Sequence, residues 1–237
     1  EYLGHTLGEI AGEKAGIIRP GVPVFYAQTA EESDSVIART AEERGSFCKK
    51  IGKDAYEILE IRDKHIAFSC SSAYYGNTTW KLNNIGIYQP GNAMLAMEAM
   101  RWLTGGKGHP ERWRESLSDL KWAGRMEEVQ SGVYVDGAHN ISAAEAFAET
   151  VSGDNAEKII VFSAVKDKEY EKMAQVLCSR VNAALYIVTH IDDPRGTSAE
   201  QLRDIFRKYT DRPVEMRASV GEALAYALAV KGERSVY

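Results

Sequence analysis

From residue 133 to residue 230, short apolar runs rich in β-forming residues alternate with longer amphipathic segments. Parallel strands cannot be joined by tight turns, so strict alternation of this kind indicates parallel strands connected by helices. The second half of the chain is therefore predicted to be a Rossmann-like α/β domain. Its expected strands are 133–135, 158–165, 184–189 and 214–217, and its expected helices are 141–151, 169–181, 198–209 and 220–230.

The first half combines a parallel unit with a β-rich patch. A strand, a helix and a second strand in succession indicate a βαβ unit, and two alternating segments around a polar turn at 62–64 indicate a hairpin. We place the boundary near residue 123, which gives domains 1–123 and 124–237. The expected elements are helix 6–15, strand 22–27, helix 30–44, strands 48–51, 56–61, 65–70 and 78–87, and helices 93–103 and 111–120.

The composition excludes several classes of protein. With 44% hydrophobic and 27% charged residues, the chain can bury an ordinary globular core. A net charge of −5 argues against nucleic acid as a partner. No apolar run reaches the ~20 residues of a membrane span, and there is no signal peptide, so a cytoplasmic location is expected. Cys48, Cys70 and Cys178 lack metal spacing and read as buried thiols.

The junction after the predicted strand 133–135 is the clearest candidate site. The sequence Asp-Gly-Ala-His-Asn at 136–140 follows that strand and precedes a helix. A helix N-terminus attracts phosphates and carboxylates, Asp136 can bond a ligand, and His139 can donate to an anion. The alternative is an ordinary turn in which Asp136 or Asn140 only caps the helix.

Two motifs resemble one known family. Gly-Arg-Met-Glu at 124–127 with Asp-Gly-Ala-His-Asn at 136–140 resembles the start of the C-terminal domain of folylpolyglutamate synthases, members of the Mur ligase superfamily that often double as dihydrofolate synthases. Leu-Gly-His-Thr-Leu at 3–7 and Glu-Lys-Ala-Gly-Ile-Ile at 13–18 resemble their central domain. The resemblance implies the end of a central α/β domain followed by a Rossmann-like C-terminal domain, as the second half of a longer enzyme.

Lys14 acquires a role only through this resemblance. In the family the corresponding Lys is carbamylated and becomes an oxygen ligand for a divalent metal, which suits Mg²⁺. From the pattern alone, Lys14 is a solvated side chain near a helix C-terminus. The metal-binding His of the family would precede Glu1, so His5 is a different residue, expected at the surface.

The resemblance also assigns residues to ATP. Asn92 matches an Asn that touches ATP, although Tyr88 replaces a His of that motif; the alternative for Asn92 is a helix N-cap. Asp136 would contact the ribose or adenine, and His139 would lie near the transferred phosphate. Arg125 is our candidate for a phosphate contact, because its fork of donors pairs with phosphate oxygens; its alternative is a surface salt bridge with a neighbour such as Glu127.

Segment 163–169 resembles a Gly-x-x-x-Asp-Lys-Asp motif with Ser163 in place of Gly. Lys168 is a candidate for holding a carboxylate of the incoming glutamate, and Arg195 is a weaker candidate of the same kind. The alternative for Lys168 is a solvated Lys at a helix start. Gly-Gly-Lys-Gly at 105–108 is not a phosphate loop, because it lacks the upstream Gly and the following Ser or Thr.

The implied activity is an ATP-dependent and Mg²⁺-dependent ligase that joins L-glutamate to folates or to dihydropteroate through an acyl phosphate. The alternatives are a Mur-type ligase of cell-wall precursors and a non-catalytic nucleotide-binding module. We expect a monomer, with no nucleic-acid or membrane partner. Without a phosphate loop, the isolated chain is predicted to be inactive.

Overall fold

The structure, a computed structural model, describes residue 4, residues 6–62 and residues 64–237. Two residues named in the sequence analysis lie outside the described residues: His5, which was expected at the surface, and Asp63, which belongs to the predicted turn at 62–64. The chain divides into two compact units, which we name unit 1 (Glu1–Leu120) and unit 2 (Lys121–Tyr237). Both are α/β, as predicted, and each is described by itself.

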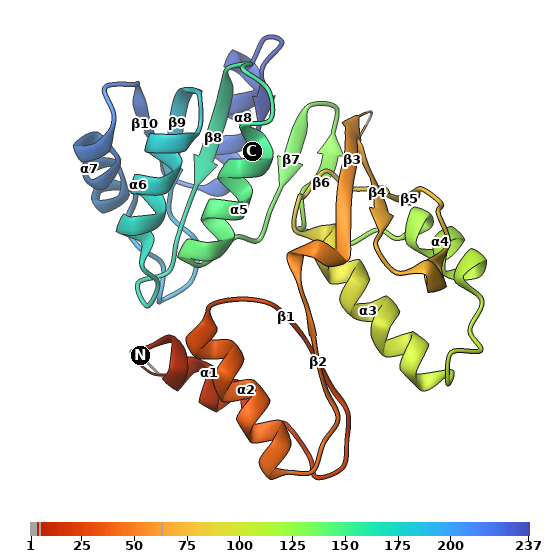
Figure 1. Cartoon of the computed structure of the whole chain (residues 1–237). Helices are drawn as coiled ribbons and strands as arrows, with labels where there is room; N and C mark the ends of the chain where they lie inside the picture. Colours follow the sequence, from red (N-terminus) through yellow and green to blue (C-terminus); the bar gives the residue numbers. More distant parts are fainter. Residues whose placement is uncertain (1–3, 5, 63) are drawn as a thin grey trace. The chain divides into compact units, whose positions relative to one another are not determined.

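Unit 1 contains a two-stranded parallel sheet and a three-stranded antiparallel sheet (Figure 1). The helices and strands are α1 (Leu7–Ala15), β1 (Val24–Ala27), α2 (Glu31–Glu43), β2 (Cys48–Ile51), β3 (Tyr56–Arg62), β4 (His65–Cys70), β5 (Trp80–Leu82), α3 (Gln89–Leu103) and α4 (Pro110–Asp119). The predicted parallel βαβ unit and the hairpin are both confirmed.

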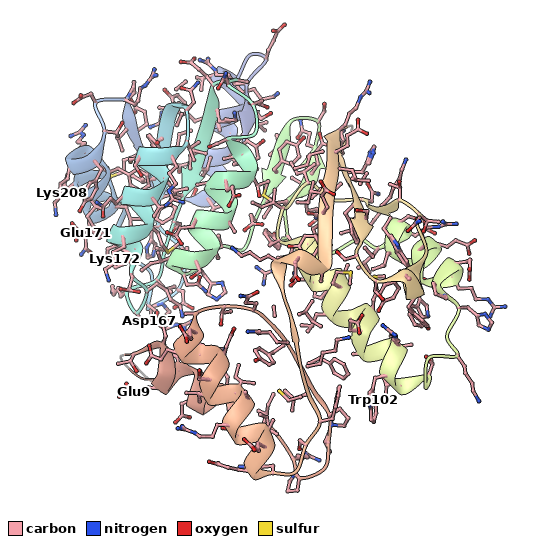
Figure 2. The ribbon with its side chains drawn as sticks, in the orientation of Figure 1. Glu9, Trp102, Asp167, Glu171, Lys172 and Lys208 are labelled. Carbon is pink, nitrogen blue, oxygen red and sulfur yellow. The ribbon has the colours of Figure 1, made fainter. Side chains whose placement is uncertain are left out.

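Helix α1 starts at a capping box. Thr6 Oγ1 accepts the Glu9 N–H at 3.1 Å, and Glu9 Oε2 accepts the Thr6 N–H at 3.3 Å. Glu9 is labelled in Figure 2. The helix packs against α2 through a small apolar cluster that includes Ala15, Ile18 and Ala41. The capping box therefore fixes where the segment bearing Lys14 becomes helical.

Asp34 fastens the start of α2 to the chain before it. Its buried carboxylate accepts the Thr29 N–H at 3.0 Å and the Thr29 hydroxyl at 3.1 Å, and it lies 3.4 Å from Lys50 Nζ. Burial raises the pKa of Asp34, but the bonds from Thr29 and Lys50 outweigh it and leave that pKa below its ordinary value. The ionised form therefore stabilises unit 1.

This geometry predicts a pH-dependent stability. With a folded pKa below the unfolded value of about 3.9, Asp34 stabilises unit 1 above pH ~4, and the contribution is lost as pH falls through the folded pKa. We expect Asp34→Asn to lower the unfolding free energy of unit 1 at pH 6 and to have a smaller effect near pH 3, measured by urea unfolding. Asp119→Asn, at the exposed end of α4, is the control; an Asp34→Asn effect that did not change with pH would contradict the assignment.

The second cluster of unit 1 lies between the antiparallel sheet and α3. Its buried members include Trp80 and Phe68, which belong to the sheet, and Met94 and Met97, which belong to α3. Met94 and Met97 therefore form the packing face of this helix, whereas Met100 is 42% exposed. The predicted strand 78–87 is wrong in length, because β5 ends at Leu82 and the Asn84 side chain accepts the Gly86 N–H at 2.7 Å, which turns the chain.

Unit 2 has one six-stranded sheet in the order β10-β9-β8-β11-β7-β6, parallel except for β6. The helices and strands are β6 (Glu127–Gln130), β7 (Val133–Val135), α5 (Ile141–Val151), β8 (Lys158–Phe162), α6 (Tyr170–Arg180), β9 (Ala183–Thr189), α7 (Ala199–Tyr209), β10 (Val214–Arg217), α8 (Val220–Val230) and β11 (Ser235–Val236). The predicted alternation is confirmed, with strand 158–165 shortened to end at Phe162.

Helices cover both faces of this sheet, which gives three layers (Figure 1). Ile159 and Ile187 pack with Ala223 and Ala227 of α8. Tyr186, next to Ile187, faces the opposite side of the sheet, because neighbouring residues of a strand alternate in direction. Its ring centroid lies 5.0 Å from that of Phe206 of α7, with the two rings tilted by 50°. This burial on both faces explains the nearly continuous apolar runs of β8 and β9.

Two further observations bear on the sequence predictions. None of the three cysteines forms a disulfide, and all are only half-buried. Burial raises the pKa of the Cys70 thiol to about 12. Within the described residues, no helix combines the length and apolar character needed to cross a membrane.

Candidate active site

Three loops of unit 2 leave the same edge of the sheet, after β7, β8 and β9. Because these strands are parallel, their carboxyl ends lie together, and in open α/β sheets ligands bind at this edge. Asp167, labelled in Figure 2, lies in the loop after β8. The loops carry Asp136, His139, Lys168 and Arg195, so the structure places four candidates from the sequence at one edge of the sheet.

The loop after β7 is organised by Asp136. Its Oδ1 accepts the Ala138 N–H at 2.8 Å, and its Oδ2 accepts the Met126 N–H at 2.9 Å. Helix α5 is capped by Asn140, whose Oδ1 accepts the Ala143 N–H at 2.9 Å. Of the two capping alternatives, Asn140 is therefore correct and Asp136 is not the cap. Asp136 instead bonds the turn that carries Arg125.

His139 is exposed, and its Nδ1 lies 2.8 Å from the Gly137 carbonyl oxygen. A carbonyl can only accept, so Nδ1 carries the proton in this arrangement. In the neutral ring Nε2 is then an acceptor, and it donates to an anion only when the ring is protonated. The geometry allows His139 to act on a phosphate as an imidazolium.

Arg125 is half-buried in the turn before β6. An ideal Cβ built on Gly137 would lie 2.9 Å from Arg125 Nη1, so the guanidinium lies close against the loop after β7. In the same turn the Gly124 N–H donates to Glu127 Oε2 at 2.8 Å. Arg125 and Asp136, separated in sequence, therefore come together in space.

The loops after β8 and β9 are joined to each other. Val165 and Gly196 form an isolated antiparallel bridge, and the Lys166 N–H donates to the Arg195 carbonyl at 2.7 Å. The side chain of Lys168 is half-buried, with Nζ 4.0 Å from Asp167 Oδ2. This bridge places the basic residues of both loops in one region, a pairing with no local signal in the sequence.

Asp193 holds Arg195. Its Oδ1 accepts both the Arg195 N–H, at 2.8 Å, and the Arg195 Nε–H, at 3.2 Å. Hydrogen bonding and the charge of Asp193 raise the pKa of Arg195, which therefore remains a cation. No motif in the sequence marks Asp193 for this role.

Lys14 and Asn92 lie in unit 1. Lys14 is exposed on the last turn of α1. The N-cap alternative for Asn92 is wrong, because α3 already begins at Gln89 with Tyr88 as its cap, and Asn92 Nδ2 donates to Gln89 Oε1 at 3.0 Å. Asn92 is exposed on the first turn of the helix.

The described part of the chain does not by itself form a magnesium site. Within residues 4, 6–62 and 64–237, no group of three or more His, Cys, Asp or Glu side chains could hold a metal ion. Lys14, even as a carbamate, would supply one ligand group and would need others.

Comparison with known proteins decides the family. Residues 124–236 match the family described as Mur ligase, glutamate ligase domain. Unit 2 belongs to the Mur ligase family. The Mur ligase domain occupies nearly all of unit 2, and its first matched residue is the Gly124 that opens the motif bearing Arg125.

Full-length relatives are similar to this chain over both of its units. A dihydrofolate synthase/folylpolyglutamate synthase of Bacillus subtilis is 36% identical over 213 residues, covering 85% of this chain and 48% of that protein. The structure of E. coli FolC in complex with DHPP and ADP is 26% identical with a TM-score of 0.76, covering 99% of this chain and 54% of that one. The chain thus spans about half the length of these relatives.

A third similarity shows the fold alone. The Mycobacterium tuberculosis folylpolyglutamate synthase complexed with ADP and AMPPCP has a TM-score of 0.83 at 23% identity, covering 97% of this chain and 54% of that one. Each unit therefore has the fold of the matched part of that protein, with a parallel-rich sheet in unit 2 and a parallel and an antiparallel sheet in unit 1.

Proposed function

We propose that this chain provides the C-terminal half of an ATP-dependent ligase that adds L-glutamate to folates, to dihydropteroate or to both. The observation that carries the proposal is the junction after β7, where Arg125, Asp136 and His139 meet beside a helix N-terminus. The names of the relatives, which are folate ligases, favour folate over cell-wall precursors.

The proposed reaction has two steps. ATP transfers its terminal phosphoryl group to the carboxylate of dihydropteroate or of a folate, giving an acyl phosphate and ADP. The amine of glutamate then attacks the acyl carbon, the amide bond forms, and phosphate leaves with the bonding electron pair. Both steps move negative charge, so fixed cations and oriented N–H groups are the contribution expected from the protein.

The residues have distinct proposed roles. Arg125 and protonated His139 neutralise phosphate charge, and Asp136 contacts the ribose or adenine. Lys168, with Arg195 in the joined loop, holds a carboxylate of glutamate. In unit 1, Asn92 contacts ATP.

Lys14 and Mg²⁺ form a separate part of the proposal. Carbamylation would turn the exposed Lys14 amine into an oxygen ligand of the kind Mg²⁺ prefers. When bound, Mg²⁺ would offset phosphate charge. We also propose a cytoplasmic, monomeric enzyme.

A chimera tests the function. In the B. subtilis relative, the half that matches this chain is replaced by residues 1–237, and glutamate addition to dihydropteroate and to tetrahydrofolate is followed by mass spectrometry. We expect a product heavier by one glutamate residue, dependent on ATP. A folded chimera with no product from either acceptor would reject the function.

In that chimera, Arg125→Ala should lower kcat/KM for ATP about ten- to a hundredfold, because a desolvated charge-assisted contact contributes roughly 1.5 to 3 kcal/mol. Arg180→Ala is the matched control, since Arg180 lies on α6 and its side chain is 53% exposed. Equal, small effects of the two substitutions would remove Arg125 from the phosphate site.

A further inference from the structure

Met126 has an unusual backbone conformation for its residue type. Its φ is 48°, in the left-handed region that non-glycine residues seldom occupy, and its side chain is only 3% exposed. Such conformations persist only where surrounding contacts enforce them, and they concentrate at functional sites. Gly124, two residues earlier, is also left-handed, with φ 66°. Arg125 therefore lies between two residues of unusual conformation.

Hydrogen bonds enforce this turn from the loop after β7. The Met126 N–H donates to Asp136 Oδ2 at 2.9 Å, and the Gly137 N–H donates to the Gly124 carbonyl at 2.8 Å. Asp136 Oδ1 is at the same time bonded to the Ala138 N–H at 2.8 Å, which orients the carboxylate. Both neighbours of Arg125 in the sequence are thus fastened to the same loop.

Gly137 leaves room for the arginine. A Cβ at this position would lie 2.9 Å from Arg125 Nη1, 3.6 Å from Cζ and 3.3 Å from the Gly124 oxygen. Gly137 is not among the glycines with positive φ, so its backbone does not itself require glycine. A side chain at this position would therefore have to displace the guanidinium.

We propose that Asp136 and Met126 are positioning residues for Arg125, and that Gly137 is glycine so that the guanidinium can lie against the loop after β7. The left-handed turn directs the Arg125 side chain there, and Asp136 holds the turn. The ligand of the positioned guanidinium would be a phosphate group of a nucleoside triphosphate; this last clause rests on the proposed function, whereas the positioning does not.

The first test displaces the guanidinium without removing a polar group. Gly137→Ala is compared with Gly221→Ala, which lies at the start of α8, where a Cβ would meet nothing closer than 4.0 Å. In ¹⁵N-labelled residues 1–237, we expect Gly137→Ala alone to move the Arg125 Nε–H resonance and to weaken ATP binding in an NMR titration about tenfold. An unmoved resonance in a folded variant would overturn the proposal.

The second test addresses Asp136 and does not depend on nucleotide. Asp136→Asn leaves one oxygen to accept two N–H groups, so hydrogen exchange at Met126 or Ala138 should accelerate at least tenfold while the amides of α8 stay protected. Unchanged exchange at both residues would overturn the role of Asp136. If exchange and the Arg125 resonance change but Arg125→Ala leaves ATP binding unaffected, the positioning stands and the phosphate role of Arg125 is rejected.

Discussion

Trp80→Ala is expected to unfold unit 1 under conditions in which unit 2 remains folded. Trp80 is 1% exposed and contacts the rings of Phe68 and Tyr75, so truncation leaves a large cavity in the cluster that joins the antiparallel sheet to α3. Removing a buried Trp typically costs about 3 to 5 kcal/mol, which is much of the stability of a small domain. Hydrogen exchange followed by mass spectrometry reports the two units separately.

Trp102→Ala is the matched control. Trp102 lies near the end of α3, with 47% of its surface exposed, and is labelled in Figure 2. Its replacement should change the unfolding free energy by about 0.5 kcal/mol or less. Equal exchange in the two variants would show that Trp80 does not hold unit 1 together. A parallel loss of protection in unit 2 would show that the units do not unfold separately.

The separate unfolding follows from how each unit is built. In unit 2, β10, β9, β8, β11 and β7 form a continuous parallel sheet with helices on both faces. In unit 1 the parallel sheet has only β1 and β2, and two-stranded sheets gain little stability alone. We therefore expect unit 2 to fold without unit 1, and unit 1 to be the less stable of the two.

Local patterns predicted the elements of unit 2 well. Helices 141–151 and 220–230 and strand 214–217 have the predicted bounds, because each has a strong period and a clear cap or turn at its ends. The position of β11 between β8 and β7 had no such signal. The two residues of β11 cannot by themselves determine which strands lie beside it, because the order of strands in a sheet depends on contacts between distant segments.

In the candidate site, too, local features could be predicted from the sequence and long-range features could not. The residue types at 136–140 and the start of α5 were readable, since Asp, His and Asn after a β-rich run predict a polar junction. The left-handed conformation of Met126 could not be predicted, because only Gly, Asn or Asp commonly indicates such a turn in a sequence. The bridge between Val165 and Gly196, which joins the loops of Lys168 and Arg195, is likewise a long-range feature.

Residues 1–237 alone are expected to make no ADP when given ATP, Mg²⁺, a folate and glutamate. The sequence contains no phosphate loop, and Gly-Gly-Lys-Gly at 105–108 lacks the spacing of one. Such a loop surrounds the β- and γ-phosphates with backbone N–H groups, and those contacts supply much of the affinity for a nucleotide. In the proposed site, Arg125, His139 and Asn92 would provide side-chain contacts only. ATP should therefore bind weakly, with a dissociation constant of about 1 mM or higher, near −4 kcal/mol.

Two measurements on the purified chain decide between weak binding and catalysis. Calorimetric titration with ATP should give little or no heat, and a coupled assay should detect no ADP above the rate without protein. Turnover that disappears in Arg125→Ala but persists in Arg180→Ala would mean that the described residues handle the phosphates themselves. In that case the junction after β7 would be a complete catalytic site, because only groups placed to stabilise the charge of the transferring phosphoryl group could raise its rate.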